Sequence, residues 1–142
     1  MRRRRTPQGF TLVEVMVVLF ILLAIASAGV VAVQHFRESA KRKTAELFIR
    51  GMETPLESFN TDVGRYPTTD EGLEALRTPP QNIPNIGKWD GPYVKDNISG
   101  FDPWGNPYQY ASPGRNGYGS YDLWSVGPDN SSGTEDDICS WQ

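Results

Sequence analysis

The sequence has very few of the residues on which most catalytic and metal-binding sites depend. It contains one cysteine, Cys139, and one histidine, His35. A single cysteine excludes an internal disulfide and a cysteine-based metal cluster, so we expect Cys139 to be a partly buried structural thiol. His35 is not paired with a serine or cysteine in any local signature of a nucleophilic site. The residues therefore predict a protein that is not an enzyme.

Positive charge is also scarce beyond the first residues. The formal charge of the chain is −3, and without the four arginines at positions 2–5 it is −7. Binding to phosphate groups requires a basic surface. The composition therefore excludes nucleic acid as a partner.

One long apolar segment is present. From Phe10 to Val33 the chain has 24 residues with a single charge, Glu14. A helix of this length spans roughly 36 Å, enough to cross a bilayer core, and the arginines before it would remain cytoplasmic. We predict a transmembrane helix over 10–33. Its carboxylate would cost about 2.5 kcal/mol at the bilayer centre, so Glu14 requires a cationic partner or must reach the membrane surface.

The helical period continues into the rest of the chain, where apolar residues recur at spacings of three and four: Ala45, Phe48, Met52, Leu56, Phe59 and Val63. We expect one helix that is amphipathic in its second half and ends in a left-handed cap at Gly64. Pro55 cannot donate to the carbonyl of Gly51, which predicts a bend rather than an end.

Short elements are predicted after this helix. Thr68 and Glu71 have the spacing of a capping box. The loop 81–105 is rich in aromatic residues, which we expect to cover a sheet. Segments 107–110 and 121–125 alternate as strands do, and the turn residues between them predict an antiparallel hairpin.

The final loop is acidic, with four carboxylates within residues 129–137. Hard oxygen ligands on a flexible loop suit Ca²⁺, which binds six to eight oxygens and accepts backbone carbonyls among them. The spacing is not that of an EF-hand. On composition alone, a solvated acidic loop without a metal is an equal alternative.

The sequence resembles the major pseudopilins of type II secretion, which belong to the type IV pilin-like superfamily. The resemblance covers nearly the whole chain. It rests on the Gly9-Phe10 junction with Glu14, on Arg65-Tyr66-Pro67-Thr68-Thr69, on Asp102-Pro103-Trp104-Gly105 and on Ser125-Val126-Gly127-Pro128-Asp129. One departure is the lack of a proline in the apolar segment, where Gly29 could bend the helix instead.

The resemblance implies an α+β fold in which a long N-terminal helix packs on a small antiparallel sheet with a calcium-binding C-terminal loop. It implies a cleaved basic leader at 1–9, a transmembrane or fibre-core helix at 10–33 and a periplasmic head at 34–142. A prepilin peptidase would cut between Gly9 and Phe10 and methylate the new amine of Phe10. Glu14 would pair with the charged N-terminus of a neighbouring subunit.

The resemblance also implies a set of calcium ligands: the side chains of Asp129, Asp136 and Asp137 and the backbone carbonyls of Val126 and Ser131. The protein would be a structural subunit of a periplasmic helical fibre, anchored in the inner membrane, that pushes folded exoproteins toward an outer-membrane channel. Its partners would be further copies of itself, the minor pseudopilins, an inner-membrane secretion platform and its cytoplasmic ATPase.

Several alternatives stay open from the sequence. The protein could be a type IV pilin used in adhesion or motility, although such pilins usually carry a C-terminal disulfide loop. It could be a membrane-anchored calcium-binding domain that never polymerises. The apolar segment could also be a plain signal anchor, or a secretory signal cleaved after Ala26-Ser27-Ala28, which has the A-x-A form.

Overall fold

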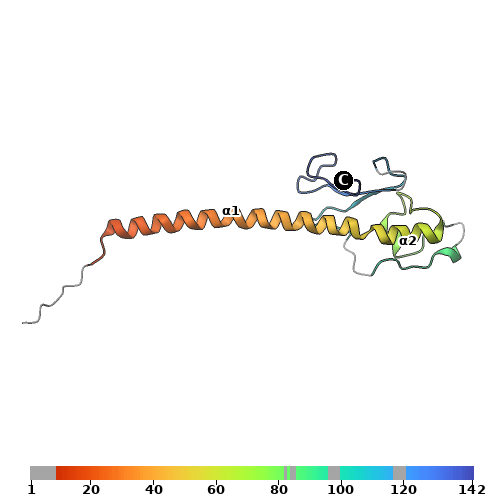
Figure 1. The fold of residues 1–142 in the computed structure, drawn as a ribbon, viewed down its shortest axis with the longest axis horizontal. Coiled ribbons are helices and arrows are strands. Elements are labelled where there is room, and N and C mark those ends of the chain that lie inside the picture. Colours follow the sequence, from red (N-terminus) through yellow and green to blue (C-terminus); the bar gives the residue numbers. More distant parts are fainter. Residues whose placement is uncertain (1–8, 82, 84–85, 96–99, 117–120) are drawn as a thin grey trace, which may run out of the picture. The chain divides into compact units, whose positions relative to one another are not determined.

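The computed structural model describes residues 9–81, 83, 86–95, 100–116 and 121–142, without the side chains of residues 27–32 and 86. It divides into two compact units, Met1–Ser39 and Ala40–Gln142. Helix α1, Leu12–Gly51, contributes to both (Figure 1).

In the first unit, helix α1 begins beside a local cap. The backbone N–H of Glu14 donates to Thr11 Oγ1 at 3.2 Å, which satisfies one of the free donors of the first turn. The large apolar side chains at positions 10–25 are exposed, with Phe10 at 84%. Among the residues that the structure describes, no helix is both long and apolar enough to cross a membrane. The side chains of residues 27–32, which belong to the predicted span 10–33, lie outside the described part.

The predicted bend in the long helix is present as an interruption of one residue. Helix α1 ends at Gly51, and helix α2, Glu53–Val63, begins after Met52. The N–H of Met52 donates to Phe48 O at 3.1 Å, and the N–H of Leu56 donates to Met52 O at 3.0 Å. Pro55 has no N–H for the carbonyl of Gly51, so the helical bonding is broken there and resumes directly afterwards. The helix is therefore interrupted near Pro55 and not at position 29, which lies within α1.

The predicted cap and capping box are both confirmed. Gly64 has φ of 87° and donates its N–H to Asn60 O at 2.8 Å. Thr68 N donates to Glu71 Oε2 at 2.8 Å, and Glu71 N donates to Thr68 Oγ1 at 3.3 Å. The guanidinium of Arg65 binds both oxygens of the Glu71 carboxylate at 2.6 and 2.7 Å and is the main cause of its lowered pKa. A short 3-10 helix, η1, follows at Leu73–Leu76.

The sheet is antiparallel, as predicted, and has three short strands in the order β1-β2-β3. Strands β1, Gln109–Ala111, and β2, Asp122–Ser125, form the expected hairpin. Strand β3, Ile138–Cys139, pairs with β2 and was not predicted. Two residues are too few to show an alternating pattern.

The core of the second unit lies between the helices and the chain that follows them. The predicted stripe is buried at Ala45, Met52, Leu56 and Phe59 and partly buried at Phe48 and Val63. It packs with residues from η1, from the loop and from β2: Ala75, Leu76, Ile83 and Leu123.

The expectation that the aromatic residues of 81–105 cover the sheet is wrong. A second 3-10 helix, η2, occupies Ile86–Lys88. The aromatic rings that follow it, Trp89 and Tyr93, contact η1 and α2. Trp89 Nε1 donates to Ala75 O at 3.1 Å, and the ring of Tyr93 meets Phe59 edge-on at 5.7 Å. Phe101 is 60% exposed.

Candidate functional site

Two groups of predicted site residues lie in separate units. Gly9 and Phe10 precede α1, and among the residues that the structure describes no atom lies within 4 Å of the position that a Cβ on Gly9 would take. Glu14 is exposed in the first turn of α1, where a negative charge is favoured by the helix dipole. Gly9, Phe10 and Glu14 are all exposed, directly before and within the first turn of a regular helix.

The predicted calcium ligands lie on the loop that joins β2 to β3. Val126 and Asp137, at its two ends, are buried, while Asp129 and Ser131 are exposed. Asp137 Oδ2 accepts a hydrogen bond from Gly133 N at 2.7 Å. The loop thus starts and finishes against the sheet and projects outward between these points.

Three predicted ligand oxygens converge on the hydroxyl of Thr134, which sequence reasoning missed. Thr134 Oγ1 lies 2.7 Å from Asp136 Oδ1, 3.1 Å from Ser131 O and 3.4 Å from Asp137 Oδ1. A hydroxyl has a single proton to donate, so three acceptors compete for it. The same hydroxyl is the first cause of the lowered pKa of Asp136. This concentration of hard oxygen atoms fits a hard cation.

Asp129 is arranged differently. Its Oδ1 accepts from Ser131 N at 2.8 Å, and its own N–H donates to Asp136 Oδ2 at 3.4 Å. In the part of the chain that the structure describes, no group of three His, Cys, Asp or Glu side chains is placed to hold a metal ion. The loop carries oxygen donors of the kind that Ca²⁺ binds, while the Asp129 carboxylate is engaged with the backbone N–H of Ser131.

A buried hydrogen-bond network supports the start of this loop. Ser125 Oγ donates to Asp102 Oδ2 at 2.6 Å and accepts from Gly127 N at 3.2 Å. Asn106 Nδ2 donates to Gly127 O at 3.2 Å. In the sequence, Asp102 stands out only as part of the motif Asp102-Pro103-Trp104-Gly105 that carries the resemblance. In the structure the turn at 102–106 fixes the backbone from which the acidic loop departs.

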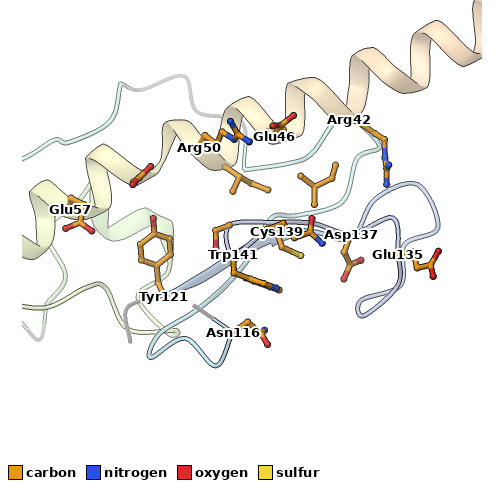
Figure 2. Close-up of a pocket in the computed structure, with 15 residues that line it drawn as sticks. Arg42, Glu46, Arg50, Glu57, Asn116, Tyr121, Glu135, Asp137, Cys139 and Trp141 are labelled. Carbon is orange, nitrogen blue, oxygen red and sulfur yellow. Dashed lines mark ion pairs between the residues drawn. The ribbon is translucent and has the colours of Figure 1, made fainter. Parts of the chain in front are cut away.

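Helix α1 also reaches the loop. Arg42 donates from a guanidinium nitrogen to the carbonyl oxygen of Asp136 at 3.0 Å. Arg42 lines an open groove of about 710 Å³ between the helices and the C-terminal residues, together with Asp137 and Cys139 (Figure 2). Sequence reasoning missed Arg42, because its contact is 94 positions away and only the fold brings the two residues together.

Cys139 is the partly buried free thiol that the sequence predicts. Burial and then the nearby carboxylates of Asp137 and Asp122 raise the pKa of its thiol to about 11. The reactive species is the thiolate, which is scarce at neutral pH in this environment. This environment disfavours the reactive form of Cys139.

Comparison with known families matches both the N-terminal segment and the rest of the chain. The model of the family "Type II secretion system (T2SS), protein G" matches residues 32–141, and that of the "Prokaryotic N-terminal methylation motif" matches residues 4–30. The chain belongs to the type II secretion system protein G family. The second match covers Gly9, Phe10 and Glu14, so both parts of the resemblance seen in the sequence are confirmed.

Relatives in this family match the chain over nearly its whole length. The type II secretion system core protein G of Aeromonas hydrophila is 42% identical over 140 residues, which are 98% of this chain and 95% of the relative. That of Pseudomonas aeruginosa is 40% identical over 144 residues, or 98% of each chain. The crystal structure of the major pseudopilin of enterohaemorrhagic Escherichia coli has a TM-score of 0.62 and 35% identity and covers 76% of this chain and 92% of that one.

We expect the loop to depend on the absence of a side chain at Gly127. A Cβ there would lie 2.7 Å from Asp136 O, and its φ is 66°. Gly127→Ala should therefore destabilise the loop by strain and by this overlap, which limited proteolysis within 126–137 would measure.

Gly133→Ala is the matched control for this substitution. Gly133 also has a positive φ, 92°, but no atom of the described residues lies within 4 Å of its Cβ position. The control should retain more protease resistance than Gly127→Ala, and equal resistance of the two variants would contradict the close contact with Asp136.

Proposed function

We propose that this protein is the repeating subunit of a type II secretion pseudopilus, which polymerises into a periplasmic helical fibre and pushes folded exoproteins toward an outer-membrane channel. The observation that carries the proposal is that one chain combines a protein G head with an N-terminal methylation motif. A head of this family supports a structural role, and the motif supports a processed and polymerising N-terminus.

The first unit supports an anchoring and assembly role. Its apolar side chains are exposed over a long continuous stretch, and such surfaces in proteins mark contacts with membranes or other proteins. We infer that the segment 10–33 lies in the inner membrane before assembly, with the head in the periplasm, and in the fibre core afterwards. Packing of identical subunits head to tail would give an open helical array.

Glu14 would act at the first contact between subunits. Its exposed carboxylate lies four residues after Phe10, and cleavage after Gly9 would provide each neighbour with a charged amine at Phe10. Pairing the two charges would remove the cost of burying either alone in an apolar core. The pair would also fix the axial register between helices. A prepilin peptidase, the minor pseudopilins and the inner-membrane platform with its ATPase would be the partners in this process.

The acidic loop would hold Ca²⁺ through Asp136, Asp137 and the carbonyl of Ser131, with Asp129 and the carbonyl of Val126 completing the set. The three oxygens that converge on Thr134 support this assignment. When bound, the ion would offset the mutual repulsion of the carboxylates and add its binding energy to the stability of the folded loop.

Processing is tested by the mass of the protein isolated from its native membrane. We expect a chain that begins at Phe10 and is one methyl group heavier than its sequence. A chain that begins at Gly29 would instead indicate an ordinary secreted domain, and the proposed function would be wrong.

Assembly is tested by Glu14→Ala. Removing one partner of a buried ion pair costs about 3–5 kcal/mol, so this variant should be cleaved and inserted normally but should yield almost no sheared fibres in electron micrographs. Glu74→Ala, which removes an exposed carboxylate from the head, is the control and should assemble. Normal fibres from Glu14→Ala would contradict the pairing.

Calcium binding is tested by thermal unfolding of the head in the purified full-length chain. Calcium at about 100 times its Kd would stabilise the folded state by about 2.7 kcal/mol, so EDTA should lower the Tm by several degrees. Asp137→Asn should unfold at the lower temperature with or without EDTA. Glu135→Gln, at a position with no assigned ligand role, should respond as the native chain does. An unchanged Tm of the native chain would disprove the calcium role.

A further inference from the structure

Arg42 is the contact through which helix α1 reaches the acidic loop. It donates to Asp136 O at 3.0 Å, and Figure 2 shows its side chain pointing from the helix toward the loop that carries Asp137 and Glu135. Arg50 lies about two turns further along the same helix. It lines the same groove and pairs with Glu46 at 2.8 Å.

The backbone of Asp136 is held from a second direction. Gly127 approaches so closely that a Cβ on it would lie 2.7 Å from the same carbonyl oxygen and 2.9 Å from Asp136 Oδ2. Gly127 is in turn fixed through Ser125 to the buried carboxylate of Asp102. Asp136 is therefore held between the helix and the base of the loop, while its Oδ1 faces Thr134 among the proposed ligands.

We propose that Arg42 is a positioning residue that couples cation binding by the loop to the packing of helix α1 within the unit Ala40–Gln142. The proposal rests on the calcium role given above. Arg42 binds the carbonyl of a proposed ligand residue, so it acts on the geometry of the site without contacting the ion. It restricts Asp136 to the conformation in which its Oδ1 lies 2.7 Å from Thr134 Oγ1, the hydroxyl that also contacts Ser131 O and Asp137 Oδ1.

Arg42 has two effects on a bound cation, and they have opposite signs. Its positive charge repels the ion, so removing it would strengthen binding if repulsion dominated. Its hydrogen bond orders a loop that otherwise loses conformational entropy when the ion binds, so removing it would weaken binding if positioning dominated. Arg42 is exposed, and solvent weakens the interaction between exposed charges. The repulsion is therefore weak, and the proposal is that the ordering effect of the hydrogen bond exceeds it.

Coupling of this kind is reciprocal. If the contact of the loop with α1 strengthens cation binding, then cation binding strengthens the contact of the loop with α1 by the same free energy. Calcium would thus stabilise residues 40–51 of the helix as well as the loop. The ion would act on the part of the helix that carries the head.

The test compares Arg42→Ala with Arg50→Ala in the full-length chain, purified in a non-ionic detergent and titrated with CaCl₂. Both variants remove one positive charge from α1, but only Arg42 contacts the loop. The loss of one hydrogen bond is expected to weaken Ca²⁺ binding by about 5-fold in Arg42→Ala. Arg50→Ala should bind as the native chain does. Equal or tighter binding by Arg42→Ala would overturn the proposal.

Hydrogen exchange provides a second readout that a purely local effect on the loop would not change. In the native chain, CaCl₂ should slow exchange both in 126–137 and in the helix around Arg42. In Arg42→Ala, saturating CaCl₂ should protect only the loop. Protection of the helix that persists in this variant would overturn the coupling.

A native chain that binds no Ca²⁺ would disprove the calcium role and this proposal with it. The mass and Glu14→Ala experiments would still decide the pseudopilus role separately. If the native chain binds Ca²⁺ normally but Arg42→Ala and Arg50→Ala bind it equally well, the calcium role stands and only the coupling is wrong.

Discussion

The fold of the unit Ala40–Gln142 depends on one apolar stripe that runs along the end of α1 and through α2. Leu56 and Phe59 are fully buried in it, and η1, the aromatic loop and β2 all contribute side chains to the same cluster. Burial of each large apolar side chain is favourable by about 1.5–3 kcal/mol. An isolated hairpin is only marginally stable and gains stability from packing against a helix, so the helices provide the surface on which the sheet forms.

The features that the sequence predicts correctly are those that neighbouring residues encode. The spacing of Thr68 and Glu71, the missing N–H of Pro55 and the hairpin between 109 and 125 are local patterns, and the structure contains each of them. The aromatic loop was assigned to the wrong surface, because hydrophobicity shows that a ring is buried without showing what covers it. The two residues of β3 gain their strand conformation from pairing with β2.

The candidate site also combines features that the sequence shows with features that only the tertiary structure creates. The carboxylates and their clustering are visible in the sequence. The parts that hold them in place, Arg42 on the helix and Asp102 behind Ser125, act across 94 and 23 positions and belong to the tertiary structure. Thr134 is a further case, since only the turn of the loop shows that one hydroxyl meets three acceptors. Sequence reasoning thus finds the charged groups of such a site more readily than the neutral and backbone groups that arrange them.

The environment of Cys139 has a practical consequence for the study of this family member. A thiol with a pKa of about 11 is almost entirely protonated at neutral pH and reacts slowly with maleimides and with oxidants that act on thiolates. Cysteines introduced at exposed positions of α1 would react far faster. Contacts between subunits could therefore be mapped by selective labelling or cross-linking without replacing the native residue.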